Sequence, residues 1–227
     1  MNWEKTIERF ILFIDILGFK DLVNRVSHEA IFNKMQSLVD TINEVSKKYK
    51  GNISLKTEIK PVIFSDSIIL ITKEGNIEDI IELINSAIYV FQKSIADVLP
   101  IKGALSYGVF TSDFEQSLHF GQPLIDAFQL QEELQLYAIV LDNFVEEFLK
   151  KNNFDSKDII KYYTPTKNGK INYFLINPLA GLEDRTQKDD FTKSIEEFYC
   201  KVSGKPRIYI DNTLKLIEHI NKTLMLV

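Results

Sequence analysis

Residues 13–23 read FIDILGFKDLV, in which a single aspartate interrupts the apolar segment FIDIL and a glycine follows it. The apolar run ILFI leads into Asp15, and Gly18 follows three positions later. A continuous apolar run of strand length is typical of a central strand that is covered on both faces. A carboxylate at the end of such a strand needs a compensating partner, because a buried, unpaired charge is expensive. The position of Asp15 therefore raises the question of what it binds.

Apolar periodicity outside this stretch predicts long helices that alternate with hairpins. Residues 28–49 have helical spacing, and Asn76 is placed to cap a second long helix that ends near Pro100. Between them, residues 53–73 alternate as two strands around a turn, which puts Asp66 at or just after the hairpin tip. The elements predicted next are a strand at 101–110, a returning arm through 117–121, a helix from Pro123, a strand at 137–141 and a helix at 143–152.

The order β-α-α-β-β-α-β-β-α-β-α indicates an α+β fold, with a mixed sheet and helices packed on it. Residues 1–152 are predicted to form the core, and residues 153–227 an elaboration that packs on the same domain. In this tail the sequence shows one clear strand, INYFLIN, and then two helical segments at about 189–203 and 207–224.

Composition excludes several classes of protein. The net charge is −5 and no block of Lys or Arg occurs, which argues against general electrostatic binding to nucleic acid or to an anionic membrane. The chain has one cysteine, Cys200, so neither an intrachain disulfide nor a cysteine-based zinc site is expected. It has no run of 18 apolar residues and no apolar signal core near the N-terminus, and a cytoplasmic protein is therefore expected.

Two carboxylates are predicted at strand turns, Asp15 and Asp66. If their strands are neighbours in the sheet, both carboxylates lie at the same edge. Hard divalent cations take carboxylate, water and phosphate oxygens, and two such ions can activate an attacking oxygen and stabilise a leaving one. Gly18 would let backbone approach phosphates closely. This chemistry suits phosphoryl or nucleotidyl transfer. The alternative is that each Asp is only a cap or a turn residue.

Four segments resemble the motifs of class III nucleotidyl cyclases. FIDILGFKDL resembles the first metal motif, and IFSDSIILI the second, with Ser65 at the family's Gly. IKGALSYGVF is similar to the strand that follows, with Lys102 at the family's Arg, and HFGQPLIDAFQLQEELQLYAIVL is similar to the segment before the next strand. Together they span roughly residues 8–145. The resemblance implies a ferredoxin-like βαββαβ core with added hairpins, here followed by the C-terminal helical elaboration.

The resemblance also implies a mechanism. Asp15, Asp66 and the backbone carbonyl of Ile16 would hold two Mg²⁺ or Mn²⁺ ions. One ion would lower the pKa of the ribose 3′-hydroxyl that attacks the α-phosphate of a nucleoside triphosphate, and the other would stabilise the pyrophosphate, giving a 3′,5′-cyclic nucleotide. The site would lie between the two protomers of a homodimer. The positions expected to bind the nucleotide are Leu17, Gly18, Phe19, Val62, Phe64, Lys102, Leu118, Phe120, Asp126 and Gln129.

The chain departs from the purine cyclases where the family reads the base. Val62 and Leu118 stand at base-reading positions, and Ile125 and Gln129 align with the transition-state Asn and Arg. One explanation is a pyrimidine substrate, as in the bacterial Pycsar anti-phage cyclases, which make cyclic UMP or cyclic CMP for a responsive effector. The alternatives are a purine cyclase with a rearranged pocket and a catalytically degenerate binding or regulatory module.

Nearby charges bear on this choice. No Lys or Arg lies beside Asp15 or Asp66 in the two motifs, so a bound metal is the expected partner, and this favours an active enzyme. Lys102 has two interpretations: a cation that compensates phosphate charge, or a solvated edge residue. Glu132 and Glu133 are predicted to lie on a solvated helix face.

Overall fold

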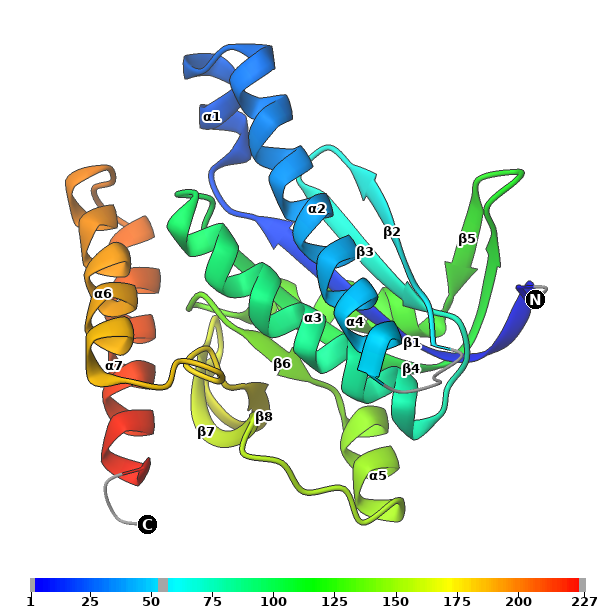
Figure 1. Cartoon of the computed structure of the whole chain (residues 1–227). Coiled ribbons are helices and arrows are strands. Elements are labelled where there is room, and N and C mark those ends of the chain that lie inside the picture. Colours follow the sequence, from blue (N-terminus) through cyan, green and yellow to red (C-terminus); the bar gives the residue numbers. More distant parts are fainter. Residues whose placement is uncertain (1–2, 53–56, 225–227) are drawn as a thin grey trace.

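The computed structural model describes residues 3–52 and 57–224. They form an eight-stranded sheet with helices packed on it (Figure 1). The elements are β1 (Thr6–Ile16), α1 (Phe19–Arg25), α2 (His28–Asn52), β2 (Ile59–Phe64), β3 (Ser67–Thr72), α3 (Ile77–Ala96), β4 (Ile101–Asp113), β5 (Leu118–Gly121), α4 (Gln122–Glu133), β6 (Ile139–Leu141), α5 (Asn143–Lys151), β7 (Ile159–Thr166), β8 (Gly169–Ile176), α6 (Arg185–Glu196), the 3₁₀ helix η1 (Glu197–Cys200) and α7 (Pro206–Leu224).

The element order predicted up to residue 152 is confirmed. The strand order in the sheet is β2-β3-β1-β4-β6-β8-β7, and β5 pairs with β4. The pairs β2–β3, β3–β1 and β1–β4 are antiparallel, which is the arrangement of a ferredoxin-like βαββαβ unit. The α+β prediction and the ferredoxin-like core are therefore confirmed. The first residues of the strand predicted from position 53, residues 53–56, lie outside the described residues.

β1 is the central strand of this unit and is covered on both faces. Helices α2 and α3 lie side by side across one face of the sheet (Figure 1). Helix α4 covers the other face, where the ring centroids of Phe13 and Phe128 lie 5.4 Å apart. Phe10, Leu12 and Ile14 alternate with Phe13 along β1, and all four are buried. This double covering explains the continuous apolar run that precedes Asp15.

Two helix starts follow the expected local chemistry. The side chain of Asn76 accepts a hydrogen bond from the backbone N–H of Asp79 at 2.9 Å, and the Asp79 carboxylate accepts one from the N–H of Asn76. This capping box satisfies backbone donors at the start of α3. Pro123 lies in the first turn of α4, where its missing N–H costs nothing.

The prediction of one strand in the tail is wrong, because the structure has two. β7 precedes β8, and the two form an antiparallel hairpin. The sequence signal of β7 is weak, since Lys161 and Pro165 interrupt its apolar residues. β8 pairs with β6 through Val140 and Leu175, so the tail extends the same sheet. The two helical segments predicted after it are confirmed as α6 with η1, and α7, whereas the domain boundary after residue 152 stays a prediction.

Candidate functional site

The two aspartates predicted at strand turns lie at the same end of adjacent strands. β1 and β3 are neighbours, and Asp15 is paired with Ser67, the residue after Asp66. The backbone N–H of Ile16 donates a hydrogen bond to the carbonyl oxygen of Asp66 at 2.9 Å. This bond fixes the β2–β3 turn against the end of β1. The predicted adjacency of Asp15 and Asp66 is therefore confirmed, and both residues are half-buried.

Two unusual backbone conformations frame this end of the sheet. Ser65 has a φ of 57°, which lies in the left-handed region, and it turns the chain just before Asp66. That conformation costs a residue other than glycine about 1–2 kcal/mol. Gly18 has a φ of 76°, and no atom would meet a Cβ placed on it. Gly18 is exposed, and it turns the chain from the end of β1 into α1.

Asp15 has a cation beside it, which the sequence analysis did not expect. Lys102 is its direct cross-strand partner on β4. Burial raises the pKa of the Asp15 carboxyl, and the charges of Asp66 and Glu132 act in the same direction, whereas the Lys102 ammonium lowers it. The expectation that no Lys or Arg compensates Asp15 is wrong, because strand pairing brings together two residues that are far apart in the sequence. Burial at this strand end therefore does not by itself require a metal.

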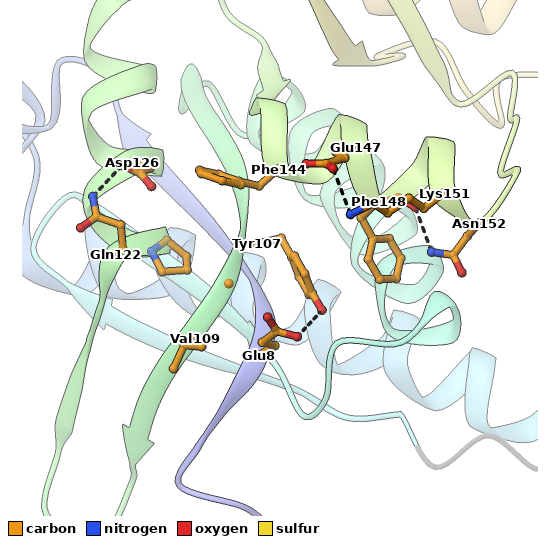
Figure 2. Close-up of a pocket in the computed structure, with 12 residues that line it drawn as sticks. Glu8, Tyr107, Val109, Gln122, Asp126, Phe144, Glu147, Phe148, Lys151 and Asn152 are labelled. Atoms are coloured by element: carbon orange, nitrogen blue, oxygen red, sulfur yellow. Dashed lines mark hydrogen bonds and ion pairs between the residues drawn. The ribbon is translucent and has the colours of Figure 1, made fainter.

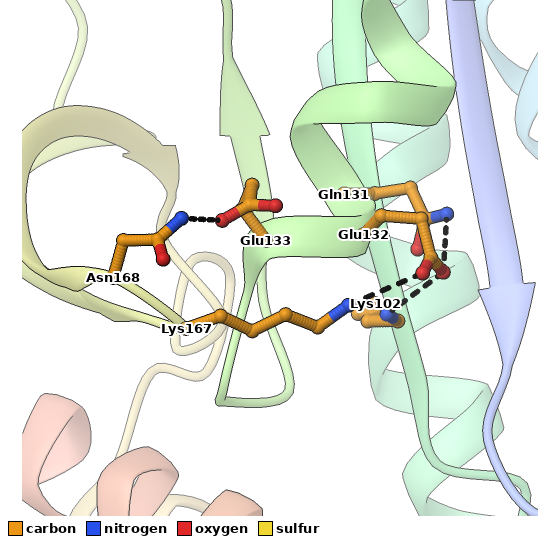
Figure 3. Close-up of polar contacts among 6 residues, drawn as sticks. All are labelled: Lys102, Gln131, Glu132, Glu133, Lys167 and Asn168. Carbon is orange, nitrogen blue, oxygen red and sulfur yellow. Dashed lines mark hydrogen bonds and ion pairs between the residues drawn. The ribbon is translucent and has the colours of Figure 1, made fainter.

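Lys102 is neither exposed nor at an edge. Lys102 is 3% exposed, and its Nζ lies 3.4 Å from Oε1 of Glu132 on α4. The Lys167 Nζ, at the tip of the β7–β8 hairpin, lies 3.3 Å from the other oxygen of the same carboxylate. Both lysines reach Glu132 in Figure 3. The interpretation of Lys102 as a solvated edge residue is therefore wrong.

The prediction that Glu132 and Glu133 lie on a solvated helix face is incomplete: the Glu132 side chain is 44% exposed, but both carboxylates also contact other elements. Burial raises the pKa of Glu132, but the opposite effects of Lys102 and Lys167 together leave it below its usual value. The Glu133 carboxylate accepts a hydrogen bond from Nδ2 of Asn168 at 2.7 Å. Helix α4 thus uses both carboxylates to contact other elements.

Helix α7 also approaches this cluster. Burial raises the pKa of Tyr209, Lys167 lowers it, and the charges of Glu132 and Asp15 raise it further. The Tyr209 ring stacks on the ring of Tyr137, with centroids 6.0 Å apart. The C-terminal elaboration therefore borders the Asp15 end of the sheet.

The carboxylates fit a hard cation in number and kind. Among the described residues, no group of three or more His, Cys, Asp or Glu side chains gathers in a metal-binding arrangement. Asp15 and Asp66 supply two carboxylates whose charges oppose each other, which is a setting that a cation stabilises. A magnesium-type ion with two carboxylate ligands takes its other oxygens from water and phosphate. The residues present thus fit an ion that is completed by a phosphate-bearing molecule.

Within one chain, the structure does not bring the two base-contacting residues expected on β5, Leu118 and Phe120, to Asp15. Phe120 pairs with Thr111, which in turn pairs with Thr6 at the opposite end of β1. At roughly 3.3 Å per residue, this places Phe120 about 30 Å from Asp15 along the strand. Leu118 lies further along the same hairpin.

The positions expected on β2 lie closer, because they belong to the hairpin that carries Asp66. Val62 packs on a small apolar cluster of Ile11, Ile71 and Phe110. Phe64 is 80% exposed. Nucleotide contact by Val62, Phe64, Leu118 and Phe120 stays a prediction.

Asp126 and Gln129 lie on the side of α4 that faces α5 and β8. Asp126 accepts a hydrogen bond from Gln122 at 2.8 Å, and it lines a cavity of about 560 Å³ together with Glu8 and Tyr107 (Figure 2). Glu8 precedes Asp15 by seven residues on β1, so the cavity lies about 20 Å away from it. A role for Asp126 and Gln129 in nucleotide binding stays a prediction.

Glu132 and Lys167 were not predicted from the sequence to lie with Asp15 and Lys102 in one charged cluster. Their charges were visible, but their position depends on how α4 and the β7–β8 hairpin pack on the sheet. One signal was available: a lysine in a strand as apolar as IKGALSYGVF needs a buried partner.

No protein-family model matches the chain, and no curated protein matches it. Solved structures share its fold. The catalytic core of a rhodopsin-guanylyl cyclase with converted specificity, in complex with ATPαS, is 13% identical with a TM-score of 0.57, and the match covers 77% of this chain and 97% of that one. The guanylate cyclase domain of RhGC from Catenaria anguillulae, in complex with GTP, is 14% identical with a TM-score of 0.54, over 77% and 98%.

A bacterial light-regulated adenylyl cyclase is 14% identical with a TM-score of 0.53, and the match covers 86% of this chain and 99% of that one. The chain therefore has the fold of adenylate and guanylate cyclase catalytic domains. In the part of the chain that the structure describes, no helix has the length and apolarity that crossing a membrane demands.

Proposed function

We propose that this protein is a nucleotide cyclase that converts a nucleoside triphosphate into a 3′,5′-cyclic nucleotide and pyrophosphate. The observation that carries the proposal is the hydrogen bond from the Ile16 N–H to the Asp66 carbonyl, which sets two carboxylates at one end of adjacent strands. The fold shared with cyclase catalytic domains supports the same reading. Phosphoryl chemistry of this kind depends mainly on positioning and on charge stabilisation.

Each part of the site has a task in this proposal. Asp15, Asp66 and the carbonyl of Ile16 would hold two Mg²⁺ or Mn²⁺ ions, which supply activation of the 3′-hydroxyl and stabilisation of the leaving pyrophosphate. The backbone of Leu17, Gly18 and Phe19 would lie against the phosphates. Lys102 would compensate phosphate charge as a point cation.

The proposed substrate is a pyrimidine nucleotide, UTP or CTP. Apolar Val62 and Leu118 stand where purine cyclases place polar base-reading side chains, and an apolar pair cannot make those hydrogen bonds. The proposed biological role, anti-phage signalling through an effector that responds to the cyclic nucleotide, rests on the resemblance to Pycsar cyclases alone.

A homodimer is proposed because one chain does not complete the site. The end of β2, β5 and α4 carry large exposed apolar side chains, which is unusual for surfaces that stay in water. In a dimer, these elements of one protomer would supply the residues that contact the base in the site of the other protomer. The side chains in question are Ile63, Phe64, Leu118, Phe120, Ile125 and Phe128. Replacing Phe64 by Lys should shift the protein from dimer to monomer in sedimentation, whereas an unchanged dimer would contradict this interface.

A second candidate function is a degenerate cyclase-fold module that binds a ligand or partner. It is favoured by one observation: Lys102 already compensates part of the Asp15 charge, so the fold does not need a metal there.

Binding of nucleoside triphosphates separates the two candidates. For the cyclase, binding should require Mn²⁺ or Mg²⁺ and should be lost in Asp66→Ala. Binding that ignores both the metal and the substitution would favour the degenerate module and overturn the proposed two-metal site.

A further inference from the structure

Lys102 is shared between two carboxylates that belong to different parts of the fold. It faces Asp15 across the β1–β4 pair, and its Nζ lies 3.4 Å from Glu132 on α4. The Lys102 side chain is only 4% exposed, so solvent screens these interactions weakly. An ammonium in this position would oppose any cation that binds Asp15. How strongly it opposes that cation depends on how much of its charge Glu132 balances.

Glu132 is itself held by three neighbours. Besides Lys102, its carboxylate accepts hydrogen bonds from Nε2 of Gln131 at 3.3 Å and from Nζ of Lys167 at 3.3 Å. The Lys167 side chain is 46% exposed and the Lys102 side chain 4%, whereas the Glu132 side chain between them is 44% exposed. Glu132 thus divides its charge between a buried cation and an exposed one (Figure 3).

The hairpin that carries Lys167 is fixed to the end of α4 by backbone hydrogen bonds. The Lys167 N–H donates to the carbonyl of Glu133 at 2.8 Å, and the Gln135 N–H donates to that of Pro165 at 3.1 Å. Asn168 adds its side-chain bond to Glu133. The docking of the hairpin therefore holds the backbone of Lys167 beside the end of α4, from which its side chain reaches Glu132.

We propose that Glu132 is a positioning residue of the cation site: it holds the Lys102 ammonium and so leaves the Asp15 carboxylate available to a divalent cation. Lys167, from the C-terminal elaboration, sets the strength of this hold. The elaboration is then part of the site and tunes it. This inference rests on the proposed function, since it assumes that Asp15 and Asp66 bind a divalent cation. Groups that orient or tune a metal ligand from outside typically change metal affinity 10- to 100-fold when they are replaced.

The test measures how tightly the full chain binds Mn²⁺, using the electron paramagnetic resonance signal of free Mn²⁺. This readout does not depend on catalytic activity. Glu132→Gln should weaken Mn²⁺ affinity about tenfold, because Lys102 then balances Asp15 alone. Glu133→Gln is the matched control, since it removes the adjacent charge without touching Lys102, and it should change affinity by no more than about twofold. Equal effects of the two substitutions would overturn the proposal.

Two further variants distinguish positioning from a merely structural contact. Lys167→Gln leaves Glu132 to Lys102 alone, so Mn²⁺ should bind a few-fold tighter, opposite in sign to Glu132→Gln. A structural role would weaken binding in both. In a Lys102→Met background, Glu132→Gln should have little remaining effect, and an undiminished effect would overturn the proposal. If Lys102→Met does not fold, the opposite effects of Lys167→Gln and Glu132→Gln on Mn²⁺ affinity still distinguish positioning from a structural contact.

Failure of this inference is distinguishable from failure of the proposed function. Wild-type Mn²⁺ affinity that is unchanged in Asp66→Asn would show that no cation binds between the two aspartates, and the proposed site would fall. Wild-type affinity that depends on Asp66 but not on Glu132 would remove only the positioning role.

Discussion

The end of β1 and the start of α3 both bury an aspartate, and burial raises the pKa of each. Asp15 is half-buried at a strand end, with Asp66 in the neighbouring turn and Lys102 across the sheet. Asp79 is 1% exposed and serves the capping box of α3. Its pKa is raised to about 7, chiefly by burial and then by neighbouring glutamates.

The two aspartates differ in what surrounds them. Burial and a raised pKa occur at both places, so they do not separate function from structure. What Asp15 has in addition is a second carboxylate that a backbone hydrogen bond holds nearby, and an ammonium shared with Glu132. Asp79 is engaged with the backbone of its own helix. A cation would therefore stabilise the pair of Asp15 and Asp66, whereas Asp79 already caps its helix.

The largest expected effect is on turnover and comes from the Asp15 end. Asp66→Asn should reduce product formation roughly a thousandfold, because a metal contributes several kcal/mol of charge stabilisation and about 1.4 kcal/mol is a factor of ten. Its melting temperature should change by less than about 2 °C, since the bond to Ile16 uses the backbone carbonyl. Rates are to be measured beside Asp79→Asn, which should keep near wild-type turnover. Equal losses in the two variants would erase the distinction between the two regions.

The next effect is on stability and comes from Asp79. Its pKa in the folded protein, about 7, lies above its ordinary value of 3.8, so the folded state binds the proton more tightly. Stability is therefore lost as pH rises through about 7. In the wild type at pH 8, ionisation of buried Asp79 destabilises the folded state by about a few kcal/mol. Asp79→Asn removes this ionisation and should therefore raise the melting temperature by several degrees at that pH.

At pH 4 the same substitution should have little effect, because wild-type Asp79 is then largely protonated. Melting curves of both proteins between pH 4 and pH 8 give the comparison. A difference that stays constant over this range would mean that Asp79 is ionised in both states or in neither.

A smaller effect is expected at the turn that presents Asp66. Ser65→Gly should stabilise the protein by about 1 kcal/mol, or about 2–4 °C, because glycine adopts the left-handed conformation without a Cβ penalty. Ser65→Ala is the control and should change little, since alanine keeps the Cβ. A gain in the alanine variant that matched the glycine variant would show that the backbone conformation is not the cause.

Much of the fold could be predicted because its signals are local. The continuous run before Asp15, the helical spacing after His28 and the cap at Asn76 each need only a short window of sequence. β7 escaped notice because Lys161 and Pro165 break its pattern, and its stability comes from pairing with β8. The pattern of residues within one segment does not show which other strand will pair with it.

The site was predictable only in part, for the same physical reason. Asp15 and Asp66 could be brought together by assuming that their strands are neighbours. The pairing of Lys102 with Asp15 depends on the register of β1 and β4. The position of Glu132 depends on the rotation of α4 on the sheet, and Lys167 on the docking of the tail. These are non-local facts that spacing does not contain.

Cyclase activity itself can be measured with a product assay. Purified protein would be incubated with Mn²⁺ and separately with ATP, GTP, CTP and UTP, and the products would be identified by mass. We expect a 3′,5′-cyclic nucleotide from UTP or CTP, and roughly a thousandfold less of it from Asp66→Asn. A cyclic purine would keep the chemistry and contradict the assignment of the base. No cyclic nucleotide from any of the four, with a folded dimer, would contradict the claim that this protein is a cyclase.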